Sequence, residues 1–292
     1  MAETITLNGA TRLVGIIGWP VEHSLSPLMH NAAFSATGLN WAYVPLPVPP
    51  NRVQEAVLGL RALGFRGANV TIPHKQAVIP YLDRITPEAQ AIGAVNTLVV
   101  DPEGAVWGTN TDAYGVLEDL RAHGVSVQGE RVLILGAGGA AHAVAYALAR
   151  QGSHVTIANR TEARAIQLAR RLHAVLPGQR FSVIPLTREA LATAARSHSL
   201  LVNTTSVGMW PHVDASPWPE EVEFGTIQVV YDVIYRPRET RLLQQARAAG
   251  CQAIDGLGML VHQGAEAWRL WTGRVPPVDI MWQAVENALD NQ

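Results

Sequence analysis

The chain is almost free of lysine: of its 22 lysine and arginine residues, only Lys75 is a lysine. Arginine stays charged at any ordinary pH, whereas burial can tune a lysine ammonium until it gives up its proton. A lysine kept in such an arginine-rich chain marks a position where arginine would not serve, so Lys75 is a candidate catalytic residue. The alternative is chance, because perturbed amines point to function only on average.

Other scarcities exclude whole classes of protein. The single cysteine excludes an internal disulfide and fits a reducing compartment. A formal net charge of −2 leaves no broad basic field for nucleic acid or acidic membranes. No apolar run approaches the ~20 residues that span a bilayer. The start, Met1 to Thr4, shows no basic stretch before an apolar run, so we expect no secretory signal and a cytoplasmic protein.

What is present suits a compact protein of about two domains: 292 residues, 48% of them hydrophobic and 16% charged. In the first part, strand and helix patterns alternate, which predicts an α/β domain with a mainly parallel sheet. The first helix is expected from Pro27, with Ser26 as its cap. The strands are expected at Arg12–Gly18, Trp41–Val48, Gly67–Ile72 and Ala94–Val100, and further helices at Val53–Leu63 and Pro87–Ile92.

The second part has a doubly wound, Rossmann-type pattern. A helix at Gly115–His123 crosses into it. Strands are expected at Arg131–Leu135, His154–Ala158, Phe181–Ile184, Leu200–Asn203 and Val229–Val233, and helices at Ala140–Gln151 and Glu162–Leu172. After Gly256 the chain turns helical again, through Met259–Thr272 and Val278–Leu289.

A glycine-rich loop, Gly136-Ala137-Gly138-Gly139-Ala140-Ala141, follows the first of these strands and opens a helix. It fits G-x-G-x-x-A, in which the glycines let the backbone approach a pyrophosphate that the helix N-terminus attracts. The strand–loop–helix context predicts dinucleotide binding over a merely structural glycine turn.

The end of the next strand indicates which dinucleotide. NAD-selective proteins usually carry an acidic residue there, to hold the ribose 2′-hydroxyl. This chain instead has Asn159-Arg160-Thr161, with Arg164 one turn on. Because arginine can pair with a 2′-phosphate, we predict NADP over NAD. A solvated arginine pair is the alternative, and Glu162 between the two could weaken the preference.

Polar side chains gather in four clusters of the first part. Ser24 and Ser26 could bind one carboxylate beside a helix start. Asn69 and Thr71 are two apart on a strand and therefore share a face, with Lys75 just beyond. The other two clusters centre on one polar residue each.

Asn96 interrupts an apolar strand, where a buried amide needs hydrogen-bond partners. Asp112 lies at the inferred domain junction, either facing a cleft or capping the following helix. Together the clusters suit hydride transfer on a polyhydroxylated acid. Lys75 could carry the hydroxyl proton that must move with the hydride, and Asp112 could position the hydroxyl and the amine. No Cys/His spacing supports a metal, so no metal site is expected.

In this order, these strings closely resemble the shikimate dehydrogenase family. The matching strings are Gly18–Asn31, Asn69–Lys75, Gly93–Leu98, Gly108–Asp112, Gly136–Ala141, Asn159–Arg164, Asn203–Met209, Tyr231–Tyr235 and Asp255–Gly264. The resemblance implies reversible reduction of 3-dehydroshikimate to shikimate by NADPH, in the shikimate pathway to aromatic amino acids. It also implies a substrate and catalytic domain of residues 1–111 and 256–292, completed by the C-terminal helices, and a Rossmann-type NADP domain of residues 112–255.

The resemblance assigns roles residue by residue. Lys75 and Asp112 would be the catalytic pair. The substrate-binding set would be Ser24, Ser26, Asn69, Thr71, Asn96, Asp112, Tyr235 and Gln263. The cofactor-binding set would be Gly136, Ala137, Gly138, Gly139, Ala140, Asn159, Arg160, Thr161, Arg164, Val233, Gly256 and Met259.

Two rival functions stay open on the sequence alone. One is a quinate/shikimate dehydrogenase that prefers NAD or accepts both cofactors. The other is a catalytically silent NADP-binding regulator, which the presence of both Lys75 and Asp112 disfavours. The chain also carries His142 where many relatives have an arginine, which would weaken phosphate binding or make it depend on pH. The sequence does not distinguish a homodimer from a monomer.

Overall fold

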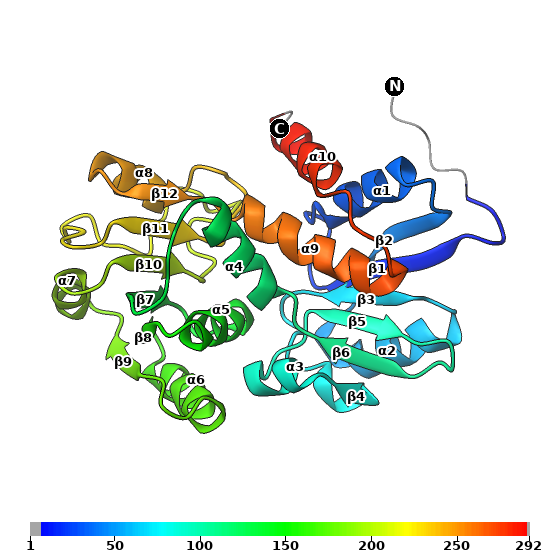
Figure 1. Ribbon diagram of the computed structural model, residues 1–292, viewed down its shortest axis with the longest axis horizontal. Helices are drawn as coiled ribbons and strands as arrows, with labels where there is room; N and C mark the ends of the chain where they lie inside the picture. The colour runs from blue at the N-terminus through cyan, green and yellow to red at the C-terminus, as the bar shows by residue number, and fades with distance from the viewer. Residues whose placement is uncertain (1–6, 291–292) are drawn as a thin grey trace. The chain divides into compact units, whose positions relative to one another are not determined.

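The computed structural model describes residues 7–290 as an α/β protein with two six-stranded sheets, the predicted fold class (Figure 1). Residues 1–6 and 291–292 lie outside the described residues, and with them the Met1–Thr4 segment and both ends of the predicted first domain. The chain forms two compact units. One comprises the residues up to Gly115 and those from Val261 onward, and the other is Val116–Leu260.

The unit boundaries fall inside two helices, α4 (Asp112–Ala122) and α9 (Leu257–Thr272). The sequence instead placed the domain limits at 111/112 and 255/256, close to where these helices begin. A helix is a continuous hydrogen-bonded rod, so composition gives no signal of the point along it at which its neighbours change.

The sheet of the first unit has the order β2-β1-β3-β5-β6-β4. Its strands are β1 (Arg12–Gly18), β2 (Trp41–Pro47), β3 (Gly67–Val70), β4 (Arg84–Ile85), β5 (Thr97–Val100) and β6 (Val106–Thr109). Most pairs are parallel, but β5 runs antiparallel to β3 and β6. The sheet is therefore mainly parallel, as predicted, with an antiparallel element that the sequence did not indicate.

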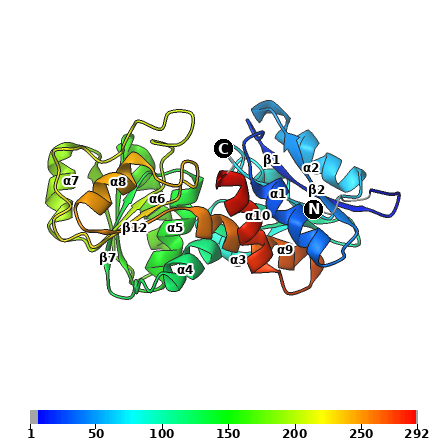
Figure 2. The ribbon, with the colours of Figure 1, turned by 90° about the horizontal axis from the view of Figure 1, so that it is seen from above.

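Helices cover both faces of this sheet. They are α1 (Ser26–Ala36), α2 (Val53–Ala62), α3 (Pro87–Ile92), α10 (Val278–Asp290) and the C-terminal part of α9. Figure 2 shows α2 on one side of the sheet and α1 on the other, where α1 packs against α10. Val57 and Leu60 of α2 are buried on Val70 and Leu98 of the strands. The apolar faces of the helices thus cover the sheet, whereas the polar residues at the strand ends stay outside this core.

The second unit has one fully parallel sheet, ordered β12-β11-β10-β7-β8-β9. Its strands are β7 (Arg131–Leu135), β8 (His154–Asn159), β9 (Phe181–Pro185), β10 (Leu200–Asn203), β11 (Val229–Asp232) and β12 (Gln252–Ile254). The chain order reverses between β7 and β10, the switch point beside which doubly wound sheets bind their ligands. This is the predicted Rossmann-type arrangement.

The helices of this unit are α5 (Gly139–Arg150), α6 (Glu162–Val175), α7 (Arg188–Ala195) and α8 (Arg241–Ala248). Val132 to Leu135 of β7 are all 0% exposed, as expected for a parallel strand covered on both faces. Among the described residues, no helix is long and apolar enough to cross a membrane.

Three local predictions were wrong. Ser26 does not cap α1: the helix begins at Ser26, the capping position is Leu25, and no side chain caps it. The Ser24 hydroxyl instead accepts a bond from the Ser26 amide at 3.3 Å. Asn96 precedes β5 rather than interrupting a strand, and Thr71 lies just beyond β3 rather than within it.

Candidate active site

Lys75 is carried by a loop that is anchored on both sides. His74, only 1% exposed, places its Nε2 2.7 Å from the carbonyl oxygen of Val48. A carbonyl can only accept, so this nitrogen carries the proton. The Lys75 carbonyl accepts a bond from the Val95 amide at 2.7 Å. The backbone that presents the amine is therefore fixed from two directions.

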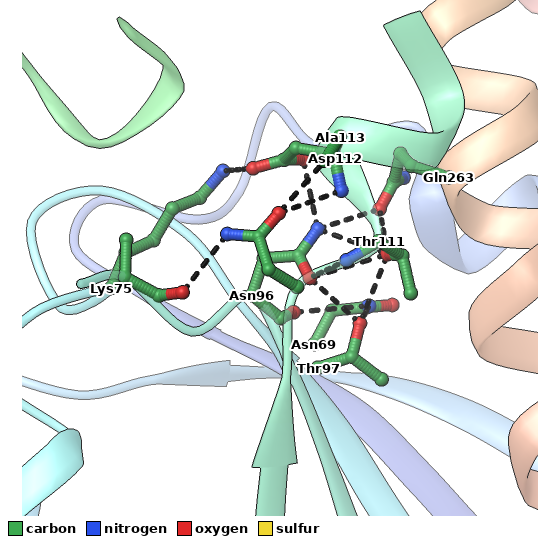
Figure 3. Close-up of polar contacts among 10 residues, drawn as sticks. Asn69, Lys75, Asn96, Thr97, Thr111, Asp112, Ala113 and Gln263 are labelled. Atoms are coloured by element: carbon green, nitrogen blue, oxygen red, sulfur yellow. Dashed lines mark hydrogen bonds and ion pairs between the residues drawn. The ribbon is translucent and has the colours of Figure 1, made fainter. Parts of the chain in front are cut away.

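The amine meets the carboxylate of Asp112, as Figure 3 shows. Lys75 Nζ donates to Asp112 Oδ2 at 2.6 Å, and the two side chains are 16% and 6% exposed. Asn96 Nδ2 donates to the other oxygen, Oδ1, at 2.8 Å. A charge-assisted bond in such a sheltered position is short and strong, so the pair is held in one geometry.

The start of α4 frees Asp112 for this contact. Asn110 Oδ1 accepts bonds from the amides of Asp112 and Ala113, at 3.0 and 3.4 Å. Asn110 Nδ2 in turn donates to the carbonyl of Ala94 at 3.0 Å. Asn110 therefore performs the capping role that was the alternative for Asp112, and the Asp112 carboxylate points at Lys75 instead.

Asn96 links several elements at this point. Its Nδ2 also lies within hydrogen-bond distance of Thr111 Oγ1 at 3.0 Å and Gln263 Oε1 at 3.3 Å. Its Oδ1 accepts from the Thr111 amide at 2.7 Å. Gln263 comes from α9, 167 residues after Asn96 in the sequence, and reaches the same cluster (Figure 3). One amide thus ties the end of β6, the start of α4 and α9 to the catalytic candidates.

Asn69 extends the network beneath this cluster. Its Nδ2 donates to the Asn96 carbonyl at 3.2 Å and to Thr97 Oγ1 at 3.1 Å. Its Oδ1 accepts from the hydroxyl of buried Tyr43 at 2.8 Å. Because both amide hydrogens are engaged, Asn69 can offer a further partner only an acceptor lone pair.

The ring of Tyr43 stacks on His30, with centroids 4.4 Å apart and planes at 5°. His30 is fully buried, and burial lowers its pKa to about 3. Neither of its ring nitrogens has a hydrogen-bond partner among the described residues. His30 is therefore a neutral, packed side chain rather than a titrating one.

Ser24 lies on the loop after β1, Ser26 is the residue at which this loop enters α1, and Thr71 lies on the loop after β3. The loops meet where the Trp19 amide donates to the Ile72 carbonyl at 3.1 Å. A Cβ at Gly18 would lie 2.5 Å from Thr71 Cγ2, so this close approach requires glycine. Within residues 7–290, no hydrogen bond joins these three hydroxyl residues to Lys75 or Asp112.

The glycine loop of the second unit has the geometry that a dinucleotide needs. Gly136 has φ +110°, and a Cβ there would lie 2.6 Å from Thr204 Oγ1. Gly138 is the N-cap of α5, and a Cβ there would meet no atom within 4 Å, so the backbone faces open space. Exposed amides at a helix N-terminus form an anion site, so these residues fit a pyrophosphate.

Arg160 and Arg164 are exposed beyond the end of β8. Among the residues that the structure describes, neither guanidinium forms an ion pair or a hydrogen bond. Between them, Thr161 is the N-cap of α6, and its carbonyl accepts from Asn159 Nδ2 at 2.8 Å. Two arginines without internal partners at the end of this strand suit a phosphate ligand.

The remaining predicted cofactor residues lie at the same end of the sheet. Gly256 donates its amide to Ile234 at 3.0 Å, and a Cβ there would lie 2.1 Å from the Val233 carbonyl oxygen. The loops after β11 and β12 therefore touch at a position that only glycine can occupy. Met259 is buried in the first turn of α9, and Tyr235 is partly exposed on the loop after β11.

Three family profiles match the chain. They are described as the shikimate dehydrogenase substrate binding domain (residues 16–98), shikimate / quinate 5-dehydrogenase (residues 119–212) and the shikimate 5'-dehydrogenase C-terminal domain (residues 256–286). A curated relative from Moorella thermoacetica, named shikimate dehydrogenase (NADP(+)), is 48% identical over 98% of this chain and 96% of its own length.

The chain belongs to the shikimate dehydrogenase family.

Solved structures agree. Shikimate 5-dehydrogenase from Thermus thermophilus, in complex with NADP(H) and shikimate, is 42% identical with a TM-score of 0.83, covering 95% of this chain and 100% of that one. Quinate dehydrogenase from Corynebacterium glutamicum, in complex with NAD, is 32% identical with a TM-score of 0.86, covering 95% and 99%. The fold is thus shared by shikimate dehydrogenases and a quinate dehydrogenase.

Several residues of this family member's site escaped sequence reasoning. Asn110 and Thr111 stood inside a string that had been singled out, but only Asp112 was chosen from it. Thr97 likewise followed Asn96 without being chosen. Tyr43 gave no signal, because an aromatic residue inside a strand is ordinarily core. Hydrogen bonding between distant strands, which spacing does not reveal, brings these residues into the site.

Within residues 7–290, no group of three or more His, Cys, Asp or Glu side chains is arranged to hold a metal ion.

Proposed function

We propose that the chain is an NADP-dependent shikimate dehydrogenase that reversibly reduces 3-dehydroshikimate to shikimate, a step toward the aromatic amino acids. The observation that carries the proposal is the sheltered contact of Lys75 Nζ with Asp112 Oδ2 at 2.6 Å. Support also comes from the relative named shikimate dehydrogenase (NADP(+)), which is 48% identical over 98% of the chain.

In the proposed mechanism, Lys75 is the proton carrier. Removal of hydride from an alcohol carbon requires the hydroxyl proton to leave as well, and a positioned amine can accept it. In the reverse direction the ammonium stabilises the developing alkoxide and returns the proton. Asp112 holds Nζ on one side and is itself fixed by Asn96, so the amine stays aligned. NADP supplies the hydride acceptor, and NADPH the hydride, when bound.

The first unit would bind the substrate. The Ser24 and Ser26 hydroxyls would hold its carboxylate. Asn69 would accept a bond from a ring hydroxyl, since both of its own amide hydrogens are engaged by the protein. Thr71, Asn96 and Gln263 complete the set proposed within the first unit, and a substrate-binding role for Tyr235 stays a prediction from the sequence.

The second unit would hold the cofactor. The glycine loop Gly136–Ala140 would bind the pyrophosphate, and Asn159, Arg160, Thr161 and Arg164 the adenosine end with its 2′-phosphate. Val233, Gly256 and Met259 would line the rest of the site. The fit rests on the open backbone at Gly138 and on the two arginines without internal partners.

Initial rates with the four substrate–cofactor pairs test the function. Shikimate with NADP should give the highest kcat/KM, followed as absorbance of NADPH. The rival supported by a specific observation is quinate oxidation with NAD, because the Corynebacterium glutamicum neighbour is named for that substrate. A higher kcat/KM for quinate with NAD would overturn both assignments. Absence of turnover at high enzyme concentration, with NADPH still bound, would favour the silent NADP-binding regulator.

A cytoplasmic location and the absence of nucleic-acid, membrane and metal partners stay predictions from the sequence.

A further inference from the structure

Asp232 is a buried carboxylate that the proposed mechanism does not use. It ends β11 and is 0% exposed. Its Oδ1 accepts bonds from Asn203 Nδ2 at 2.9 Å and from the Ile234 amide at 3.1 Å. Its Oδ2 accepts from Thr240 Oγ1 at 2.8 Å. One donor comes from the end of β10, and the other two from the two ends of the loop after β11.

The bond to Asn203 leads toward the glycine loop. Asn203 ends β10, directly beside Asp232 in the parallel register. Its Oδ1 accepts from both the amide and the hydroxyl of Thr205, at 2.9 and 2.8 Å, which shapes the first turn after β10. The preceding residue, Thr204, donates to the Leu135 carbonyl at 2.7 Å and is the closest neighbour of Gly136. Asp232 therefore supports the loop on which the glycine loop rests.

The other two bonds close the loop after β11. Ile234 lies near its beginning, and Thr240 lies at its end, where the Thr240 hydroxyl also caps α8 through the Leu243 amide at 3.3 Å. Between these points the loop carries Tyr235. Val233 at the start of the loop is pressed against Gly256. One carboxylate thus defines two loops at the carboxyl edge of the sheet, the edge at which such folds bind nucleotides.

Burial of the Asp232 carboxylate lowers the stability of the fold, so a structural role alone does not explain it. Within the described part of the chain, Asp232 forms no ion pair, and no cation acts on its pKa. Burial is the main reason that the pKa of Asp232 is raised to about 6; the charge of Asp255 adds to the rise, and the three hydrogen bonds to the carboxylate oppose it. A buried charge without a counter-ion destabilises a fold. Only an ionised carboxylate, however, accepts all three donors at once without having a hydrogen of its own to place.

We propose that Asp232 is a positioning residue for the cofactor, which fixes the loops after β10 and β11 in the shape that binds NADP. The inference rests on the proposed location of the NADP site in the second unit. It predicts that loss of the carboxylate weakens cofactor binding more than it slows the chemical step, because Asp232 acts on loop shape and not on the reacting atoms.

The test is NADPH binding to the full-length protein without substrate, measured by the fluorescence of the bound nucleotide. Asp232→Ala should raise the Kd for NADPH by ~10-fold or more, since three bonds to a charged group are lost. Asp232→Asn should raise it less, by about threefold, because an amide oxygen still accepts from Asn203 and Ile234. In steady-state assays, KM for NADPH should rise in the same order while kcat at saturation changes by less than about threefold.

Ser153→Ala is the matched control. Ser153 is also 0% exposed in the second unit and donates a buried bond to the Val127 carbonyl at 2.6 Å, but it lies beside the amino end of β8. Its loss should lower the unfolding temperature without changing the Kd for NADPH. An equal rise in Kd at an equal loss of unfolding temperature would show general destabilisation and overturn the proposal.

A folded Asp232→Ala variant with a Kd within twofold of wild type would also overturn it. If that variant does not fold, Asp232→Asn decides: an unchanged Kd contradicts the proposal. Arg160→Ala separates this inference from the proposed NADP site. An unchanged Kd in Arg160→Ala, with a raised Kd in Asp232→Ala, would refute the assignment of Arg160 and leave the role of Asp232 standing.

Discussion

At the scale of single residues, the site depends on polar side chains whose bonding capacity is nearly used up. Asn96, Asn69 and Asn110 each bond through both the oxygen and the nitrogen of their amides. A saturated amide has only one acceptable orientation, so the groups that it holds are oriented too. Because Asp112 is held in this way by Asn96, the Lys75–Asp112 pair keeps one geometry, unlike an ion pair on the surface.

His30 gives a prediction at this scale. Burial lowers its pKa from 6.5 to about 3, so the folded chain keeps it neutral while the unfolded chain protonates it below pH 6.5. Its contribution to stability is therefore present above pH 6.5 and is lost as pH falls toward 3. In thermal unfolding between pH 7 and 4, His30→Leu should lose less stability than wild type. Parallel curves for the two proteins would contradict the assignment of His30 as a buried neutral group.

The sequence predicted the catalytic and substrate-binding candidates better than it predicted the residues that hold them in place. Lys75 stood out because it is the sole lysine, and Asn96 because it interrupts an apolar pattern. Asn69 stood out because it shares a strand face with Thr71, and Asp112 because it lies at the inferred domain junction. Asn110 was missed as a cap, since Asp112 is an equally good capping residue by type. Only the fold, which places Lys75 next to Asp112, decides between the two. Tyr43 was missed because its ring is core and only its hydroxyl reaches the site, where it donates to Asn69.

At the scale of elements, the first turn of α4 places Asp112. Asn110→Ala removes the acceptor for two helix amides, and a lost cap costs about 1 kcal/mol of stability. We expect kcat to fall by roughly 10-fold, because small displacements of positioned groups are costly. Asn110→Ser, which restores a capping oxygen, should recover part of the rate.

Thr187→Ala is the control for Asn110. It removes the cap of α7, where the Thr187 hydroxyl accepts from the Ala190 amide, and should lower stability without changing kcat. If Asn110→Ala lost stability but kept its full kcat, the cap would be structural only, and α4 would not be what orients Asp112.

Asp232 gives a stability prediction of opposite sign to that of His30. Burial raises its pKa from 3.8 to about 6, so the folded chain binds the proton more tightly than the unfolded chain. Its contribution is present below pH 3.8 and is lost as pH rises through 6, by about 3 kcal/mol in all. The free energy of unfolding of wild type minus that of Asp232→Asn should therefore decrease between pH 4.5 and 7. A difference that stays constant over this range would contradict the pKa of Asp232.

The elements themselves were predicted where their patterns are long. The runs of β1 and β7 and the Ala-rich α5 are buried and regular, and their predicted limits differ from the observed ones by at most one residue. The short strands β4, β6 and β12 and the helices α7 and α8 were missed. A two-residue strand such as Arg84–Ile85 has no periodicity to detect, and pairing with β6 alone defines it.

At the scale of the whole molecule, cofactor choice is the property most open to test. Arg160→Ala and Arg164→Ala should each raise KM for NADPH by about 10-fold or more, since a bond between charged groups is lost. KM for NADH should change little, because NADH has no 2′-phosphate. Arg170→Ala, an exposed arginine further along α6, is the control and should behave as wild type. An equal rise of KM for NADPH and NADH would contradict a role of the two arginines in binding the 2′-phosphate.

The two-part organisation was predicted from the alternation of strands and helices, but the sequence alone could not assign α9. A helix after a Rossmann-type pattern can pack anywhere on the molecule. Contacts of Gln263 with Asn96 and Thr111, remote in sequence, tie it to the first unit. From the sequence, only the family resemblance predicted that the C-terminal helices complete the first domain.

We propose that the chain keeps one lysine because one step needs a proton carrier as well as a positive charge. Lys75→Arg tests it most directly, because it keeps the charge and removes the titratable amine. Turnover of shikimate with NADP should fall by about 10²–10⁴-fold, while the Kd for shikimate, measured separately, stays within a few-fold of wild type. A near wild-type kcat in Lys75→Arg would contradict proton transfer by Lys75 and leave its side chain with an electrostatic role only.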